Sequence, residues 1–306
     1  MNYLIVLNKD EDTVSYIDLN THQTVKKIAT DYNPHEVVIS PDKKKTFVTC
    51  SLGNSLYVIS NESLEVIDVI KHEDFNFPHG LAVSKKLNEL YLASTRSNKF
   101  YVLDIDSHEI KRVLDTYQDM SHMVTMSPYE KLAYVPNIGS NNISIYHTEE
   151  EKIINHFPVG NGPEGLAIYK NGDIYSANQD DNTVTVYDPA TLKEKHKLRV
   201  GILPIRAMFS PDYKYLFVPN RESHDVSIIV PDYVFCGKTR PYEIKRLPLG
   251  RWSGGVIFSD DGKFAYVANN KTNDVSVISM DDLEVIYKIK TGIHPDGIAY
   301  LKMDTE

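Results

Sequence analysis

Residues 250–290 read GRWSGGVIFSDDGKFAYVANNKTNDVSVISMDDLEVIYKIK, and this stretch decides the fold class. It contains four short runs rich in β-branched and aromatic residues, at 253–259, 263–269, 275–278 and 283–289. Turn residues separate the runs, and none of them shows the 3.6-residue period of a helix. The stretch therefore predicts four consecutive β-strands, which we call strands A, B, C and D in chain order.

The same four-run pattern recurs along the chain. The turn between strands A and B returns as Ser-Pro-Asp at 40–42, Ser-Pro-Tyr at 127–129 and Ser-Pro-Asp at 210–212, with proline pre-setting φ. An Asn or Asp precedes strand C in every copy: Asp12, Asn54, Asn98, Asn142, Asn182, Asp225 and Asp274. These residues are most simply turn formers. Four strands per repeat of about 42 residues predict a blade of a β-propeller.

Counting strands C predicts an all-β, seven-bladed propeller with four-stranded antiparallel blades, formed by residues 1–306 as one domain. The chain begins with a strand B at 3–8 and ends with an isolated strand A at 297–301. We therefore expect the first blade to combine residues 1–30 with 292–301. The C-terminal strand then closes the ring and removes its open sheet edges.

Three strand-B endings carry a resemblance to a known family. Residues 134–137 read YVPN, 217–220 read FVPN and 266–269 read YVAN, each followed by a Val-Ser-Val or Ile-Ser-Ile type of strand. The chain resembles the YVTN-type β-propeller repeat family over nearly its whole length. The resemblance implies the seven-bladed fold, whereas related propellers include lactonases, streptogramin lyases and proteins without known catalysis.

One position of the repeat carries side chains suited to chemistry. The residue at the entry of strand A recurs 41 to 49 residues apart and is, around the ring, Asp296, His35, His79, His122, Glu164, Ile205 and Gly254. Strand A is the innermost strand of a blade, so these side chains are expected to share one end of the central channel. Imidazoles and a carboxylate are accepted by divalent Fe, Mn, Zn, Cu or Ni.

The sequence therefore predicts a transition-metal site formed by His35, His79, His122 and Glu164. Asp296 and Glu164 are the predicted catalytic acid–base groups, and Asp296 is alternatively a metal ligand or a partner that orients His35. A structural interpretation stays open at this point, in which the histidines bond channel waters or backbone carbonyls.

The remaining predicted site residues belong to the blades that lack such groups. Arg206, Arg251, Trp252 and His224 are expected to bind the substrate on the non-metal side of the site. A basic and aromatic surface on an acidic protein suits a small anionic or aromatic substrate.

Composition excludes other partners. The formal net charge of −9 argues against binding to nucleic acid or to an anionic membrane. The chain has only 2 cysteines, no membrane-length apolar run and no basic, apolar leader at its start, so we expect a cytoplasmic protein.

Two functions compete at this level. The first is a metal-dependent enzyme that acts on a small molecule at the axial end of the channel, by hydrolysis or elimination as the default, with a redox reaction left open. The second is a non-catalytic scaffold for protein interactions. Its best sequence feature is an insertion at 232–241 between strands C and D of the sixth blade, containing Tyr233, Phe235 and Arg240, which is expected to form a loop.

Overall fold

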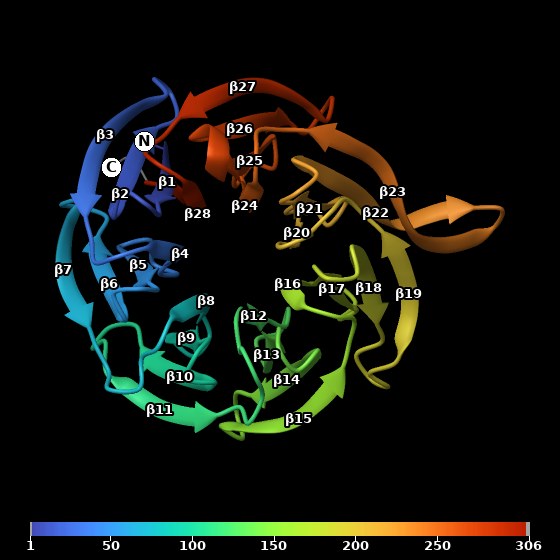
Figure 1. Cartoon of the computed structure of the whole chain (residues 1–306), viewed down its shortest axis with the longest axis horizontal. Helices are drawn as coiled ribbons and strands as arrows, with labels where there is room; N and C mark the ends of the chain where they lie inside the picture. The colour runs from blue at the N-terminus through green and yellow to red at the C-terminus, as the bar shows by residue number, and fades with distance from the viewer. Residues whose placement is uncertain (1, 304–306) are drawn as a thin grey trace.

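The structure, a computed structural model, describes residues 2–303, and they form a ring of seven four-stranded antiparallel sheets (Figure 1). Blade 1 contains β28 (Pro295–Lys302), β1 (Asn2–Asn8), β2 (Thr13–Asp18) and β3 (Gln23–Ala29). Blade 2 contains β4 (Pro34–Ile39), β5 (Lys45–Cys50), β6 (Ser55–Ser60) and β7 (Glu65–Ile70). Blade 3 contains β8 (Pro78–Ser84), β9 (Glu89–Ser94), β10 (Lys99–Asp104) and β11 (Ile110–Asp115). Blade 4 contains β12 (Thr125–Met126), β13 (Leu132–Asn137), β14 (Asn142–His147) and β15 (Lys152–Pro158).

The other three blades repeat this order. Blade 5 contains β16 (Pro163–Ile168), β17 (Ile174–Asn178), β18 (Thr183–Tyr187) and β19 (Glu194–Arg199). Blade 6 contains β20 (Met208–Phe209), β21 (Leu216–Asn220), β22 (Asp225–Phe235) and β23 (Lys238–Pro248). Blade 7 contains β24 (Ser253–Phe258), β25 (Phe264–Asn269), β26 (Asp274–Ser279) and β27 (Glu284–Lys290), with the short 3₁₀ helix η1 (Asn270–Thr272) after β25. Within residues 2–303, no helix has the length and apolar character needed to cross a membrane.

The predicted fold is confirmed, including the closure of the ring by the C-terminal strand. Strand β28 pairs antiparallel with β1, with Tyr3 opposite Leu301 and Ile5 opposite Ala299. Figure 1 shows the red C-terminal strand beside the dark blue N-terminal one, at the inner edge of the same blade. The two ends of the chain therefore share one sheet.

The hydrophobic core lies between the blades. Apolar side chains from neighbouring sheets form seven clusters, one at each junction around the ring. Phe47 of blade 2 and Leu92 of blade 3, for example, belong to one cluster and are fully buried or nearly so. Alternate residues of each strand face opposite neighbours, which explains why both faces of the inner strands are apolar.

The asparagine that ends strand B is a structural residue. In β25, the Asn269 amide donates to Asp274 Oδ1 at 2.6 Å and to Ser276 Oγ at 2.9 Å, and its oxygen accepts the Gly250 N–H at 3.1 Å. The same two donations recur from four further buried asparagines: Asn8, Asn137, Asn178 and Asn220. Each asparagine thus joins strand B to the turn and to strand C.

Replacing Asn269 by alanine is expected to lower the free energy of unfolding by about 2–3 kcal/mol, because buried hydrogen-bonding groups lose their partners. Urea denaturation measures the change. Asn20→Ala is the matched control, since Asn20 is exposed and its side chain has no hydrogen bond within residues 2–303. Equal stabilities of the two variants would contradict the structural role.

The sixth-blade insertion differs from its prediction. Residues 232–241 do not form a loop, because β22 and β23 extend as a paired hairpin out to Phe235 opposite Lys238. The extension projects outward from the ring (Figure 1). Strand pairing satisfies its backbone groups, and the alternation of Tyr233 and Phe235 fits a strand better than a loop.

Candidate functional site

Seven equivalent loops lead into the innermost strands, and all share one left-handed backbone position. The residue two positions before the strand-A entry is left-handed in every blade: Asn33, Phe77, Met120, Gly162, Leu203, Trp252 and His294. The backbone N–H of this left-handed residue donates a hydrogen bond to a side chain that precedes strand C. The accepting residues are Asp12, Asn54, Asn98, Asn141, Asn182, His224 and Asn273. These bonds stabilise a left-handed conformation that is costly for a bulky residue such as Phe77 or Trp252.

This frame brings the strand-A entry residues together around the axis. The side chains of His35, His79, His122, Glu164 and Asp296 are all buried. The rings of His79 and His122 stack at a centroid distance of 3.7 Å with an interplanar angle of 25°. The His35 ring meets His79 edge-on at 4.3 Å. The three imidazoles, distant in sequence, are therefore direct neighbours.

At one side of the histidines, Asp296 is held by a cation. Lys9 Nζ donates to Asp296 Oδ2 at 2.9 Å, and the same oxygen lies 3.2 Å from His35 Nε2. Burial disfavours the charge on Asp296, but Lys9, with His35 and Arg221, outweighs this effect and keeps its pKa below the usual range. Asp296 is thus an ionised group in close contact with His35.

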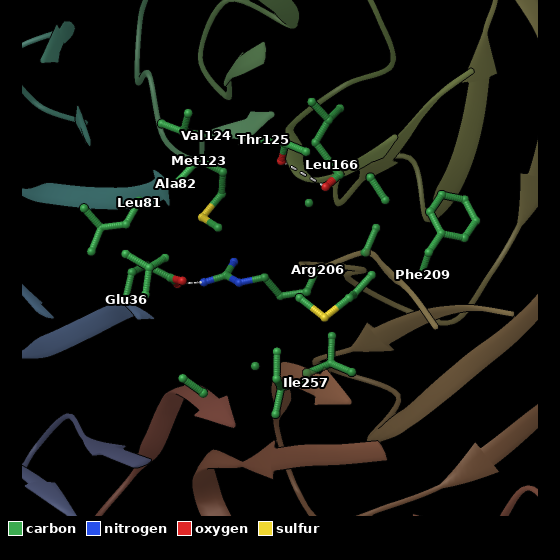
Figure 2. A pocket seen from close by; sticks show the side chains of 18 of the residues that line it. Glu36, Leu81, Ala82, Met123, Val124, Thr125, Leu166, Arg206, Phe209 and Ile257 are labelled. Carbon is green, nitrogen blue, oxygen red and sulfur yellow. Dashed lines mark hydrogen bonds and ion pairs between the residues drawn. The ribbon is translucent and has the colours of Figure 1, made fainter. Parts of the chain in front are cut away.

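At the other side, Arg206 joins two carboxylates. Its Nη1 donates to Glu164 Oε1 at 3.0 Å and to the Ile205 carbonyl oxygen at 2.9 Å. Its Nη2 donates to Glu36 Oε1 across the channel (Figure 2). Glu36 Oε1 in turn lies 4.0 Å from His79 Nε2. We call Lys9, His35, Glu36, His79, His122, Glu164, Arg206 and Asp296 the axial cluster.

Burial sets the protonation states in the axial cluster. It lowers the pKa of His35 to about 3, although Asp296 acts in the opposite direction. It also lowers the pKa values of His79 and His122 well below the usual range, so all three imidazoles are neutral near pH 7. Burial raises the pKa of Glu36 to about 7, with Asp296 and Glu164 adding to the effect and Arg206 opposing it.

The predicted substrate residues occupy different places. Arg206 lies inside the axial cluster with its guanidinium on carboxylates, whereas Arg251 is exposed at the surface. The His224 ring accepts the Trp252 N–H at 3.2 Å and so supports the loop frame.

Trp252 belongs to a basic and aromatic rim. Its ring is flanked by Arg221 at 5.4 Å and by Lys271 at 4.6 Å. The ring centroid of a second aromatic residue, Phe77, lies 6.0 Å from the ring centroids of His35 and His79. The Arg96 guanidinium carbon lies 4.6 Å from the same Phe77 centroid. We call Phe77, Arg96, Arg221, Trp252 and Lys271 the rim.

The axial cluster offers donor atoms that a metal ion could use. Within the axial cluster, three buried nitrogens have no hydrogen-bond partner among residues 2–303: Nδ1 of His35 and both ring nitrogens of His79. Neutral imidazoles with free nitrogens fit a divalent transition metal in kind. Their arrangement is not that of an assembled site, since residues 2–303 contain no group of three or more His, Cys, Asp or Glu placed to hold a metal ion. The stacking of His79 on His122 and the pairing of Glu164 with Arg206 account for this.

Two members of the axial cluster were absent from the sequence prediction. Glu36 directly follows a strand-A entry residue, and the equivalent residues of four other blades are glycines: Gly80, Gly165, Gly255 and Gly297. Reading this next ring of positions would have singled out Glu36 and Arg206 as its charged members. Lys9 follows the strand-B asparagine Asn8, a position that also provides Thr95, bonded to His122 Nδ1 at 3.0 Å.

The sequence model of the YNCE-like β-propeller family matches residues 2–127 and 73–304. The chain belongs to this family. The expected likeness in fold to lactonase-type propellers is also found, because the structure of the periplasmic gluconolactonase of Pseudomonas aeruginosa matches this YNCE-like chain with a TM-score of 0.78 at 17% identity. That match covers 99% of this chain and 100% of the other.

Two further comparisons place the YNCE-like chain among diverse proteins. A chain of the hydrazine synthase of Kuenenia stuttgartiensis matches with a TM-score of 0.79 and 22% identity, over 91% of this chain and 92% of that chain. Antigen Lp49 of Leptospira interrogans is 24% identical over 211 residues, which are 61% of this chain and 46% of the antigen. The match thus spans about half the length of this curated relative. Enzymes therefore occur on this fold, and the fold does not select a reaction.

Proposed function

We propose that this YNCE-like propeller is an enzyme that acts on a small anionic molecule at the axial cluster, with a divalent transition metal held by His35, His79 and His122. The observation that carries the proposal is the set of buried, unpartnered nitrogens on His35 and His79. An unpartnered buried polar group costs about 1–3 kcal/mol, so three of them in one place favour an occupant that supplies the bonds.

The chemistry follows from the donors. A bound metal would polarise a carbonyl group or lower the pKa of a bound water, which suits hydrolysis or elimination. Binding would require His79 or His122 to turn from the stacked arrangement. Histidine ligands also suit Fe and Cu, so a redox reaction is the second chemistry to test.

The chain's own residues have separate tasks in this proposal. Asp296 fixes the orientation of His35 and is kept ionised by Lys9. Glu36, with a pKa of about 7, is suited to exchange a proton with a substrate near neutral pH. Glu164 stays on Arg206 and carries the predicted ligand or acid–base role only if that ion pair opens.

The rim supports an anionic substrate. Arg96, Arg221 and Lys271 place three cations around two aromatic rings beside an otherwise acidic chain of net charge −9. Such a surface raises the local concentration of small anions. Lactones that carry a carboxylate or phosphate are the first substrates to assay, because a gluconolactonase shares the fold.

Metal binding is tested without an activity assay. The purified chain, incubated separately with Zn, Mn, Fe, Ni and Cu, is expected to retain about one equivalent of at least one metal by mass spectrometric elemental analysis, and His79→Ala is expected to bind it roughly tenfold or more weakly. His156→Ala is the matched control, because His156 lies on the outer strand β15 and bonds Ser144. A chain that stays metal-free after all five incubations would overturn the metal assignment.

A scaffold function is the second candidate, favoured by the hairpin extension of β22 and β23. Val234 is 67% exposed and Phe235 is 55% exposed near its tip. Deleting residues 232–241 would abolish partner capture in a scaffold, whereas His35→Ala would leave capture intact. In a substrate assay, loss of turnover in His35→Ala with turnover retained after deletion of residues 232–241 would favour the enzyme.

A further inference from the structure

The central channel beyond the axial cluster contains a second space of different character. It is an open cavity of about 630 Å³ lined by residues of the innermost segments of all seven blades. Its walls are mostly aliphatic, sulfur-containing or aromatic side chains, among them Val38, Val83, Met126, Ala207, Phe209 and Ile257. All six are only partly buried, although they belong to the innermost elements. Their remaining accessible surface therefore faces the cavity, which we call the apolar channel.

A thin septum separates the apolar channel from the histidines. It is built at the ring of positions that follows the strand-A entry residues, where four blades have glycine and two provide Glu36 and Arg206. These glycines cannot be replaced by larger residues. A Cβ at Gly165 would overlap the Arg206 backbone, and a Cβ at Gly297 would overlap the His35 carbonyl oxygen. Figure 2 shows the Glu36–Arg206 pair crossing the channel, with Met123 above it.

We infer that the apolar channel is a ligand site for a linear, uncharged apolar molecule with a terminal oxygen acceptor, such as a medium-chain ketone or ester. The volume lies within the range of small-molecule sites. A space bounded by seven parallel inner strands and entered along the ring axis suits an unbranched chain. The flexible methionines Met123, Met126 and Met208 adapt to such a chain.

The charge of the septum favours a neutral ligand over a carboxylic acid. Arg206 is paired with both Glu36 and Glu164, so the three groups carry two carboxylates for one guanidinium. On the apolar side of the septum a third carboxylate would meet net repulsion, whereas at the histidines the proposed divalent metal would supply the compensating positive charge. Arg206 Nε has no hydrogen-bond partner within residues 2–303 and can donate to a neutral carbonyl oxygen. The Thr125 hydroxyl is already used on the Leu166 carbonyl oxygen.

Nile red fluorescence tests this site on the full chain. We expect saturable binding of the neutral dye, displacement by decan-2-one, and displacement by decanoate that is roughly tenfold weaker at about pH 8. Ala207→Phe and Ile257→Trp fill the channel from blades 6 and 7 and should each abolish dye binding. Ala190→Phe is the control, because Ala190 is exposed on the surface. Unchanged dye binding in both filled variants, or equal displacement by decanoate, would overturn the inference.

A labelling experiment on the unmodified chain guards against misfolded variants. A diazirine derivative of decan-2-one is expected to modify peptides that contain 37–39, 123–126 or 207–209. Labels confined to the outer strands would overturn the assignment. Metal retention by Ala207→Phe, measured as for His79→Ala, separates this site from the proposed metal function, since the two lie on opposite sides of the septum.

Discussion

Deleting residues 295–306, which contain β28, is expected to leave the chain without a stable folded state. Blade 1 then lacks its innermost strand, and β1 is left with an unpaired edge facing the axis. Burial of Ile298 and Leu301 alone stabilises the fold by roughly 1.5–3 kcal/mol each, against a total of about 5–15 kcal/mol for a typical domain. Asp296, which pairs with Lys9, is lost as well. Circular dichroism and gel filtration measure the outcome.

A circular permutant provides the control for this deletion. It joins Glu306 to Met1 by a flexible linker and opens the chain between Cys236 and Gly237, at the tip of the projecting hairpin. It retains every residue of β28. Its free energy of unfolding should lie within about 1 kcal/mol of that of the original chain, because exposed loop tips tolerate new termini. A cooperative unfolding transition in the deleted chain would contradict the role of ring closure.

The second large effect is expected at Arg206. Arg206→Met removes the cation shared by Glu36 and Glu164 and should lower the free energy of unfolding by about 3–5 kcal/mol. Unpaired buried carboxylates bind protons more tightly in the folded chain than in the unfolded one. The folded pKa of Glu36 is already raised to about 7, from the ordinary value of about 4.3. Stability from this group is therefore fully present below about pH 4 and is lost as pH rises toward 7.

Urea denaturation of Arg206→Met at several pH values tests this expectation. The loss of stability should be larger near pH 8 than near pH 5. The triple variant with Glu36→Gln and Glu164→Gln should recover much of the stability and abolish the pH dependence that Arg206→Met adds. A pH-independent loss in the single variant would show that packing of the arginine stem, and not its charge, explains the effect.

The fold could be predicted from the sequence because its information is local and repeated. The strand runs recur in every blade, strand B ends in asparagine in five blades, and the Ser-Pro turn occurs in three, so an error in one copy is corrected by the others. The hairpin of 232–241 was predicted wrongly as a loop because it occurs once. A strand outside the repeat has no equivalent to compare it with, and its turn at Cys236-Gly237 is short.

The axial position of His35, His79 and His122 was also predictable, because one register position defines one ring. Their contacts were not. The stacking of His79 on His122 and the capture of Glu164 by Arg206 depend on side-chain torsions that register does not specify. Lys9 reaches Asp296 from 287 residues away, and only the closure of the ring makes them neighbours.

At the seven left-handed loop positions, near the histidines, the backbone conformation does not depend on which side chain is present. Each backbone is held by a side chain from a neighbouring loop, so the residue at the left-handed position is free to be asparagine, phenylalanine, methionine, glycine, leucine, tryptophan or histidine. The scaffold therefore fixes the backbone at seven positions and leaves the side chain at each of them free to vary. Exchanging Phe77 or Trp252 would alter what the surface recognises while the architecture beneath it stays the same, which makes these positions natural targets for redirecting specificity.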